Sequence, residues 1–345
     1  MELAFGNWSV LTTNFLIILY MALGGVTLSS ILHLCNGKWR FEVRDIACSM
    51  AVLFPLAFIL MLILLVNGEN TFQWLAGAHD GDAHLPVWHD YTFLVLRQVI
   101  GFIAIFVLYR VFIRFQKLSE IDKSYKSQRR FRNIALLIPF AYVTYGSMIA
   151  WDYEMTMWPN WHSASYAFYH FQSNFHLYLA SFTVLLYLLA RSGKLATPLD
   201  EPKIFNYMAQ FMLGMTILYT YLYFTQYLIM WYGRLPEEMA RFNNMMFYDY
   251  AKIWWAFLML KFVIPFCTLA MTPNRHNPHV IFLVACSIVV GTWLERYTWI
   301  SGSIQGEYHI PMTHWFDIVV TVLIAVVAFL AVRWSLARNG LLKVS

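Results

Sequence analysis

The chain has 345 residues, of which 60% are hydrophobic and only 12% are charged, and its formal net charge is +5. Soluble domains carry about 25% charged residues, so this composition excludes an ordinary soluble globular protein and indicates a membrane protein. The four cysteines are widely spaced in apolar surroundings. Without a CxxC or Cys/His pattern, they predict neither a zinc site nor an iron–sulfur cluster.

The hydrophobic segments predict an all-α integral membrane protein. A helix needs about 20 apolar residues to cross a bilayer, and an open strand would leave its backbone groups unsatisfied in lipid. Residues 1–345 are therefore expected to form a single polytopic transmembrane domain of about nine helices. The N-terminus lacks the basic region and cleavage site of a signal peptide, so the first helix is expected to be retained. In chain order the predicted helices cover residues 11–34, 45–67, 91–115, 132–152, 165–191, 204–232, 247–271, 278–300 and 313–336.

Lysine and arginine are unevenly distributed between the predicted loops. The loops after the first, third and fifth helices and the tail after the ninth are basic, whereas "DYEMTMWPNWHS" contains neither residue. The positive-inside rule therefore predicts that the N-terminus is outside and the C-terminus cytoplasmic. Arg234, Arg241 and Lys252 depart from this pattern because they fall on the outer side.

Charged and polar residues interrupt the predicted helices, mostly in their outer halves. A charge at bilayer depth costs at least about 2.5–3.5 kcal/mol, so each one needs a partner or a function. Two interpretations stay open: a proton path or polar pocket that opens outward, and a set of ion pairs that lock the bundle. Carboxylates and histidines can exchange protons, which favours Glu295 and Asp317 for proton transfer and leaves Arg97 and Lys252 as structural charges. The candidate residues are Arg97, Asp152, His170, His176, Asp249, Lys252, Glu295 and Asp317.

Histidine spacing gives little reason to expect a bound metal or haem. His162 and His176 are 14 residues apart, but His162 follows Pro159 in a loop and no second pair accompanies them. His79, His84 and His89 lie in an acidic loop that resembles a metal-binding tract only in composition. The chain is predicted to bind no metal and no cofactor and to contain no catalytic residue.

Several segments, in the same order, resemble the ActF membrane subunits of alternative complex III, which belong with the NrfD/PsrC-like subunits of quinol oxidoreductases. "FTQYLIMWYGRLPEE" (224–238) is similar to the family signature F(S/A)QY…WYGN(L/I)PEE. Residues 91–110, 149–175 and 260–300 are similar to three further blocks of the family. The chain departs from the family in several places. The family usually has ten helices and a longer chain, and its Gly-Asn is Gly233-Arg234 here. Its His-Trp is Thr292-Trp293 here, and Glu295 stands where the family has Asp.

The resemblance implies an integral membrane subunit of a respiratory quinol:cytochrome c or quinol:acceptor oxidoreductase in the bacterial inner membrane. Its role would be structural, and proton translocation could accompany quinol oxidation. It implies quinol, haem c and iron–sulfur clusters in partner subunits: an ActC-like paralogue, a multihaem cytochrome c and an iron–sulfur protein. Membrane lipid is the other expected partner, and no nucleic acid is expected. Arg234, Glu237 and Glu238, at an outer turn beyond the interfacial Trp231 and Tyr232, would dock a partner.

Two other functions are compatible with the sequence. The first is the quinol-binding membrane anchor of a molybdopterin or polysulfide-reductase-type complex. The second is a secondary transporter, although such proteins usually show internal repeats and broken mid-membrane helices, and no repeat is visible here.

Overall fold

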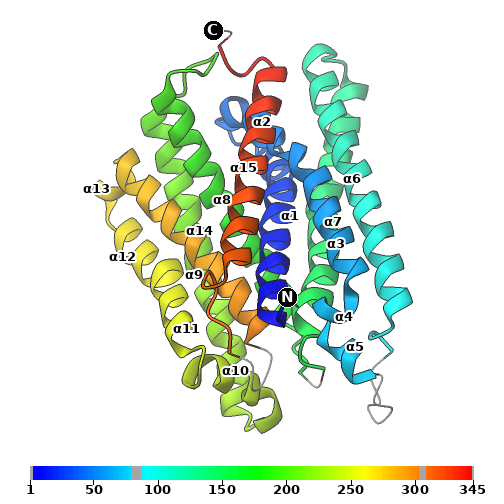
Figure 1. The fold of residues 1–345 in the computed structure, drawn as a ribbon. Helices are drawn as coiled ribbons and strands as arrows, with labels where there is room; N and C mark the ends of the chain where they lie inside the picture. Colours follow the sequence, from blue (N-terminus) through cyan, green and yellow to red (C-terminus); the bar gives the residue numbers. More distant parts are fainter. Residues whose placement is uncertain (1–2, 79–86, 160, 303–307, 344–345) are drawn as a thin grey trace.

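A computed structural model describes residues 3–78, 87–159, 161–302 and 308–343, and nearly all of this part of the chain is helical (Figure 1). Eight helical segments are long and apolar enough to cross a membrane, which confirms the prediction of an all-α, membrane-type fold. They are α1 (Phe5–Leu34), α2 to α3 (Arg40–Val66), α6 (Tyr91–Ile121), α7 with η2 (Tyr125–Met155), α8 (Tyr166–Ser192), α11 to α12 (Ala251–Ala270), α14 (Pro278–Ser301) and α15 (Trp315–Arg338).

The remaining predicted span, 204–232, corresponds to α9 (Glu201–Tyr232), whose 32 residues are long enough to cross a bilayer. It is less apolar than the other eight because tyrosine, threonine, asparagine and glutamine recur along it. α9 packs against α8 and α12 within the bundle. The shorter helices are α4 (Gly68–Thr71), α5 (Gln73–Ala78), α10 (Pro236–Phe247) and α13 (Thr272–Arg275).

Helix α1 lies at the centre of the bundle (Figure 1), and 89% of its most apolar window is buried. It is apolar on all sides and packs against helices that include α2, α3, α7, α8, α14 and α15. Gly24 and Gly25 permit the close approach of α1 to α8 and α2. A Cβ at Gly25 would lie 2.0 Å from the carbonyl oxygen of Ala47 in α2, and one at Gly24 would lie 1.9 Å from the Tyr178 ring in α8. Small residues at such contacts are typical of packed membrane helices.

We expect Gly25→Ala to destabilise the bundle by about 1–3 kcal/mol, because the new methyl group can be accommodated only if α2 moves away from α1. Gly214→Ala is the matched control: nothing lies within 4 Å of its added Cβ, so the change should be neutral or gain about 0.5–1 kcal/mol of helix stability. Thermal unfolding in detergent measures both. Equal midpoints for the two variants would contradict this account of the α1–α2 contact.

The basic loops gather at one end of the bundle, here called the basic end. Arg44 in α2 pairs with Glu120 at the end of α6, their atoms 2.6 Å apart. The backbone N–H of Lys343, beyond α15, donates to the carbonyl of Lys194, beyond α8, at 2.7 Å. The first contact joins the end of α6 to α2, and the second joins the segments that follow α8 and α15. The opposite end, called the far end, carries the α9–α10 junction and the loop before α8.

Two of the membrane helices contain a π-helical turn. The segment η2 (Trp151–Met155) ends α7, and η3 (Met259–Val263) lies between α11 (Ala251–Leu258) and α12 (Ile264–Ala270). A third interruption, the 3₁₀ turn η1 (Met50–Leu53), lies between α2 (Arg40–Ser49) and α3 (Phe54–Val66). π-helical turns are rare and often accompany functional sites. Both π-helical turns, η2 and η3, carry fully buried charged side chains.

The α9–α10 junction is a tight turn at Gly233 and Arg234. Gly233 keeps a right-handed conformation, with φ of −70°, and it is Arg234 that adopts the left-handed one, with φ of 52°. Pro236 begins α10, so the chain turns back and α10 packs against α9 and α11. A left-handed φ is uncommon for arginine.

Candidate functional site

The centre of the candidate site is Glu154, a fully buried carboxylate on η2. Arg296 of α14 donates to both of its oxygens, at 2.7 and 2.9 Å. Nδ1 of His170 in α8 lies 2.7 Å from the Glu154 carboxylate and 2.7 Å from Nη1 of Arg296. Tyr166, one turn before His170, donates its hydroxyl to Glu154. Three helical segments are thus joined through one carboxylate.

A second buried carboxylate, Glu295, extends the network. It pairs with Lys261 on η3 and with Nη2 of Arg296, the latter at 3.2 Å. The hydroxyls of Tyr169 and Ser173 on α8 donate to it, the serine at 2.9 Å. We call Glu154, His170, Lys261, Glu295 and Arg296 the central network.

The central network is electrically balanced when His170 is neutral, because two carboxylates face one lysine and one arginine. All four charged side chains are 0% exposed. Burying an unpaired ion costs several kcal/mol, so this balance is what permits four charges within the bundle.

Aromatic side chains enclose the central network. The Lys261 ammonium lies 4.3 Å from the Tyr219 ring centre. Trp299 donates its indole N–H to the Tyr169 hydroxyl at 2.9 Å. Arg241 of α10 lies over the Trp161 and Trp299 rings, 4.6 and 4.9 Å from their centres. Rings of this kind attract cations and exclude water.

Arg241 links α10 to the central network. Its guanidinium donates to the backbone carbonyls of Glu154 and Trp299, at 2.7 and 2.8 Å. Burial lowers the pKa of Arg241 to about 10, so the side chain stays cationic at neutral pH. It therefore adds a fixed positive charge beside Glu154.

A separate ion pair lies between α6 and η2. Arg97 binds the Asp152 carboxylate through Nη2 at 2.6 Å and through Nε at 2.9 Å. Gln98 and the indole of Trp88 also donate to Asp152, the indole at 2.8 Å. The Arg97 guanidinium lies 4.2 Å from the Trp88 ring centre. Asp152 and Glu154, two residues apart, point away from each other: one toward α6, the other toward α14.

Asp317, in the first turn of α15, belongs to a third group at the far end. Asn7 donates to one of its oxygens at 2.8 Å, and His309 approaches the other at 3.4 Å. The Tyr297 hydroxyl donates to the backbone carbonyl of His309 at 2.8 Å. Burial lowers the pKa of His309, which favours its neutral form.

The sequence-based candidates do not gather in one region. Arg97 with Asp152, His170 with Glu295, and Asp317 lie in three separate groups. His176 is buried on α8, and its Nε2 lies 3.3 Å from the Thr216 hydroxyl. Asp249 and Lys252 are exposed, so their prediction as site residues is wrong. The sequence predicts a helix that begins at residue 247, but α11 begins at Ala251. Asp249 therefore lies in a turn, and Lys252 lies in the first turn of the helix. Four charges of the site are visible in the sequence but are not among the sequence-based candidates: Glu154, Arg241, Lys261 and Arg296.

No group of three or more His, Cys, Asp or Glu side chains that could hold a metal ion occurs among the described residues. Residues 79–86, with His79 and His84 of the acidic loop, lie outside them. His89 and His162 line a cavity of about 230 Å³ together with Trp88, Trp151 and Trp161. This cavity adjoins both the Arg97–Asp152 pair, through Trp88, and the central network, through Trp161.

We expect Glu295→Gln to lower the free energy of unfolding by about 3–5 kcal/mol, because Lys261 and Arg296 would then share one carboxylate. The double variant Glu295→Gln/Lys261→Gln restores the charge balance and should be less destabilised than Glu295→Gln alone. Asp249→Asn, at an exposed position, is the control and should change stability by less than about 0.5 kcal/mol. Thermal unfolding in detergent reports all three, and a double variant at least as unstable as Glu295→Gln alone would contradict the pairing.

No family model matches this chain, and no curated protein matches it. The fold and site therefore define its class directly: an all-α protein of the multi-pass membrane type with an enclosed, charge-balanced ionic network near one end of its bundle.

Proposed function

We propose that this chain is an ActF-type integral membrane subunit of a respiratory quinol oxidoreductase of the alternative complex III type, located in the bacterial inner membrane. One observation carries the proposal: the segments that resemble the family supply the buried charges of the site. Residues 91–110 contain Arg97, residues 149–175 contain Asp152, Glu154 and His170, and residues 260–300 contain Lys261, Glu295 and Arg296. Just after the signature at 224–238, Arg241 folds back to the same site.

The proposed role of the central network is to lock the helices and to hold one exchangeable proton. Histidine is the side chain whose ordinary pKa lies nearest neutral pH, and His170 contacts both Glu154 and Arg296 through Nδ1. Its Nε2 has no hydrogen-bond partner among the described residues. We therefore assign proton exchange to His170 and its orientation to Glu154 and Arg296. Glu295, held by two cations and two hydroxyls, serves better as a fixed counter-charge than as the proton carrier expected from the sequence.

The proposed orientation puts the basic end in the cytoplasm and the far end, with the N-terminus, outside. The far end would then face the ActC-like, multihaem and iron–sulfur partners, which would hold the quinol, haem c and iron–sulfur clusters. Arg234 is exposed there, Glu238 is half-buried and the Glu237 side chain lies outside the described residues. We call the turn that carries Arg234, Glu237 and Glu238 the docking turn. The backbone carbonyl of Glu238 accepts a hydrogen bond from the Trp161 indole N–H at 3.1 Å, which connects this turn to the aromatic side chains around the site.

A quinol site within this chain, as in a molybdopterin or polysulfide-reductase-type anchor, is less well supported. The cavity beside the central network has about 230 Å³, below the roughly 300–1,000 Å³ typical of small-molecule sites, so the network offers little room for a quinol head group. The proposal therefore leaves quinol chemistry to a partner subunit.

Purification of the tagged chain from its native membranes tests the assignment. We expect a multihaem cytochrome c, an iron–sulfur protein and a second polytopic subunit to co-purify, and the isolated chain to show no Soret band. A molybdopterin subunit in their place would support the alternative anchor, and a chain that purifies alone would contradict both.

Charge reversal at the docking turn tests the partner surface. Glu237→Lys/Glu238→Lys should reduce co-purification of the partners, because the two carboxylates are proposed to meet basic groups on them. Asp249→Lys, also exposed at the far end but outside the turn, is the matched control. Normal assembly of the reversed variant would remove the turn from the interface.

His170→Gln should lower the number of protons released per quinol oxidised by the reconstituted complex, because glutamine retains a hydrogen-bonding group but cannot exchange a proton in this pH range. His176→Gln is a matched change on the same helix, at a histidine whose hydrogen-bond contact is to Thr216, and should leave the ratio unchanged. Vesicles with a pH-sensitive dye measure the ratio, and native gels check assembly. A ratio unaffected by His170→Gln would leave the network a purely structural role.

A further inference from the structure

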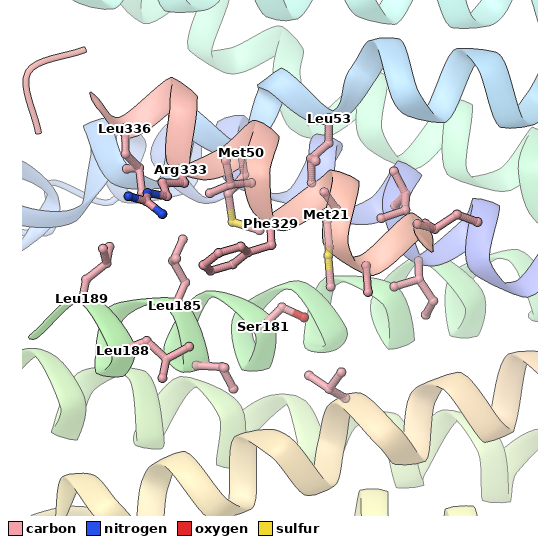
Figure 2. A pocket seen from close by; sticks show the side chains of 18 of the residues that line it. Met21, Met50, Leu53, Ser181, Leu185, Leu188, Leu189, Phe329, Arg333 and Leu336 are labelled. Carbon is pink, nitrogen blue, oxygen red and sulfur yellow. The ribbon is translucent and has the colours of Figure 1, made fainter. Parts of the chain in front are cut away.

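A second site is distinct from the central network, because no residue of that network lines it. A groove of about 530 Å³ runs between α1, η1, α8, α14 and α15 (Figure 2). It forms because α15 packs mainly on α1 and η1. Its walls are almost entirely apolar, with Met21, Leu185 and Phe329 among the side chains that line it.

The groove has cations at one end. Arg333 of α15 and Lys194, just beyond α8, both line it at the basic end, and both are exposed. Figure 2 shows Arg333 over the end of the groove that Leu189 and Leu336 also border. Backbone hydrogen bonds between the segment after α15 and the loop after α8 hold Lys194 in position: Lys343 donates to its carbonyl at 2.7 Å.

The other end of the groove is closed by a short polar chain. Trp293 donates to the Asn14 side-chain oxygen at 2.9 Å, and Asn14 donates to the Thr321 hydroxyl at 2.8 Å. Between the two ends, Ser181 is only 8% exposed, and its hydroxyl has no hydrogen-bond partner among the described residues. Figure 2 shows this side chain directed into the groove, where it can contact a polar atom of a bound molecule.

The length of the groove matches one leaflet of a bilayer. Thr321 and Arg333 are twelve residues apart on α15, which corresponds to about 18 Å of helix. Half of a typical hydrocarbon core is about 15 Å thick. A molecule with its charged group at Arg333 would thus place its apolar part along the groove and end near the bilayer midplane.

We propose that this groove binds one anionic phospholipid of the leaflet at the basic end, with its phosphate between Arg333 and Lys194 and an acyl chain along the groove. The phosphate matches the charge of the two cations, and arginine binds phosphate through two parallel hydrogen bonds. Basic pockets between transmembrane helices bind anionic head groups in this way. The acyl chain accounts for the apolar walls, and an ester oxygen of the lipid can accept a hydrogen bond from Ser181.

The test uses the purified full-length chain in nonionic detergent, after delipidation, with native mass spectrometry as the readout. Phosphatidylglycerol and phosphatidylcholine of identical acyl chains are the probes. We expect one phosphatidylglycerol to bind at least tenfold more tightly than phosphatidylcholine. Arg333→Gln/Lys194→Gln should remove that preference, and Arg338→Gln, at the same end of α15 but outside the groove, should retain it.

A second pair of variants tests the apolar part. Ala325→Trp fills the groove and should reduce binding of both lipids, whereas Val326→Trp, on the adjacent face of α15, should not. Thermal unfolding confirms that each variant is folded. Unchanged phosphatidylglycerol preference in the double glutamine variant, or retention of a prenylated quinone or a partner helix in place of phospholipid, would overturn the proposal. A lipid preference that is absent or unaffected by the double substitution, or a bound partner helix, would leave the proposed function standing, whereas a retained prenylated quinone would also move quinol binding into this chain and favour the alternative anchor.

Discussion

The pairing of two carboxylates with two cations in the interior is the constraint on which the rest of the structure depends. Arg296 contacts Glu154 and His170, which connects η2 and α8 to α14. Its neighbour Glu295 pairs with Lys261, which adds η3. Removing any one of these charges leaves another uncompensated at a cost of several kcal/mol. The helices must therefore assemble in a single register, and the aromatic side chains that enclose the network keep water from weakening it.

The same constraint explains why this chain is rich in aromatic residues on its inner surfaces as well as at the bilayer boundary. A lipid-facing bundle needs aromatic residues mainly at its two interfaces. Here a second apolar cluster of large rings, among them Trp161, Tyr169, Tyr219 and Trp299, lies between α8, α9, α10 and α14. Tyrosine and tryptophan are large and apolar but also carry a hydroxyl or indole hydrogen-bond donor. They can therefore exclude water from the buried charges and still form hydrogen bonds with them.

The helices were predictable from the sequence because each apolar run is long enough to define its own span, and the need for buried charges to pair was predictable from their cost in lipid. Which buried charges pair with one another was not predictable from the sequence. Arg97 and Asp152 are 55 positions apart, and hydropathy carries no information about which helices touch. In the sequence Arg241 lies in a predicted loop, and only the packing of α10 against the bundle brings it to the site. Asp249 and Lys252 are predicted to lie within a helix because apolar residues precede the actual start of α11.

The π-helical turns have a consequence for comparing this chain with others. Each such turn accommodates one residue more than an α-helix would, so a homologue without it would need a one-residue gap in the middle of a membrane span. Losing that residue would rotate all that follows by about 100°, which would carry Lys261, for instance, off the face that meets Glu295. Alignments that forbid gaps within helices, and helical-wheel plots drawn across residues 151–155 or 259–263, would therefore assign the wrong side chains to the interior.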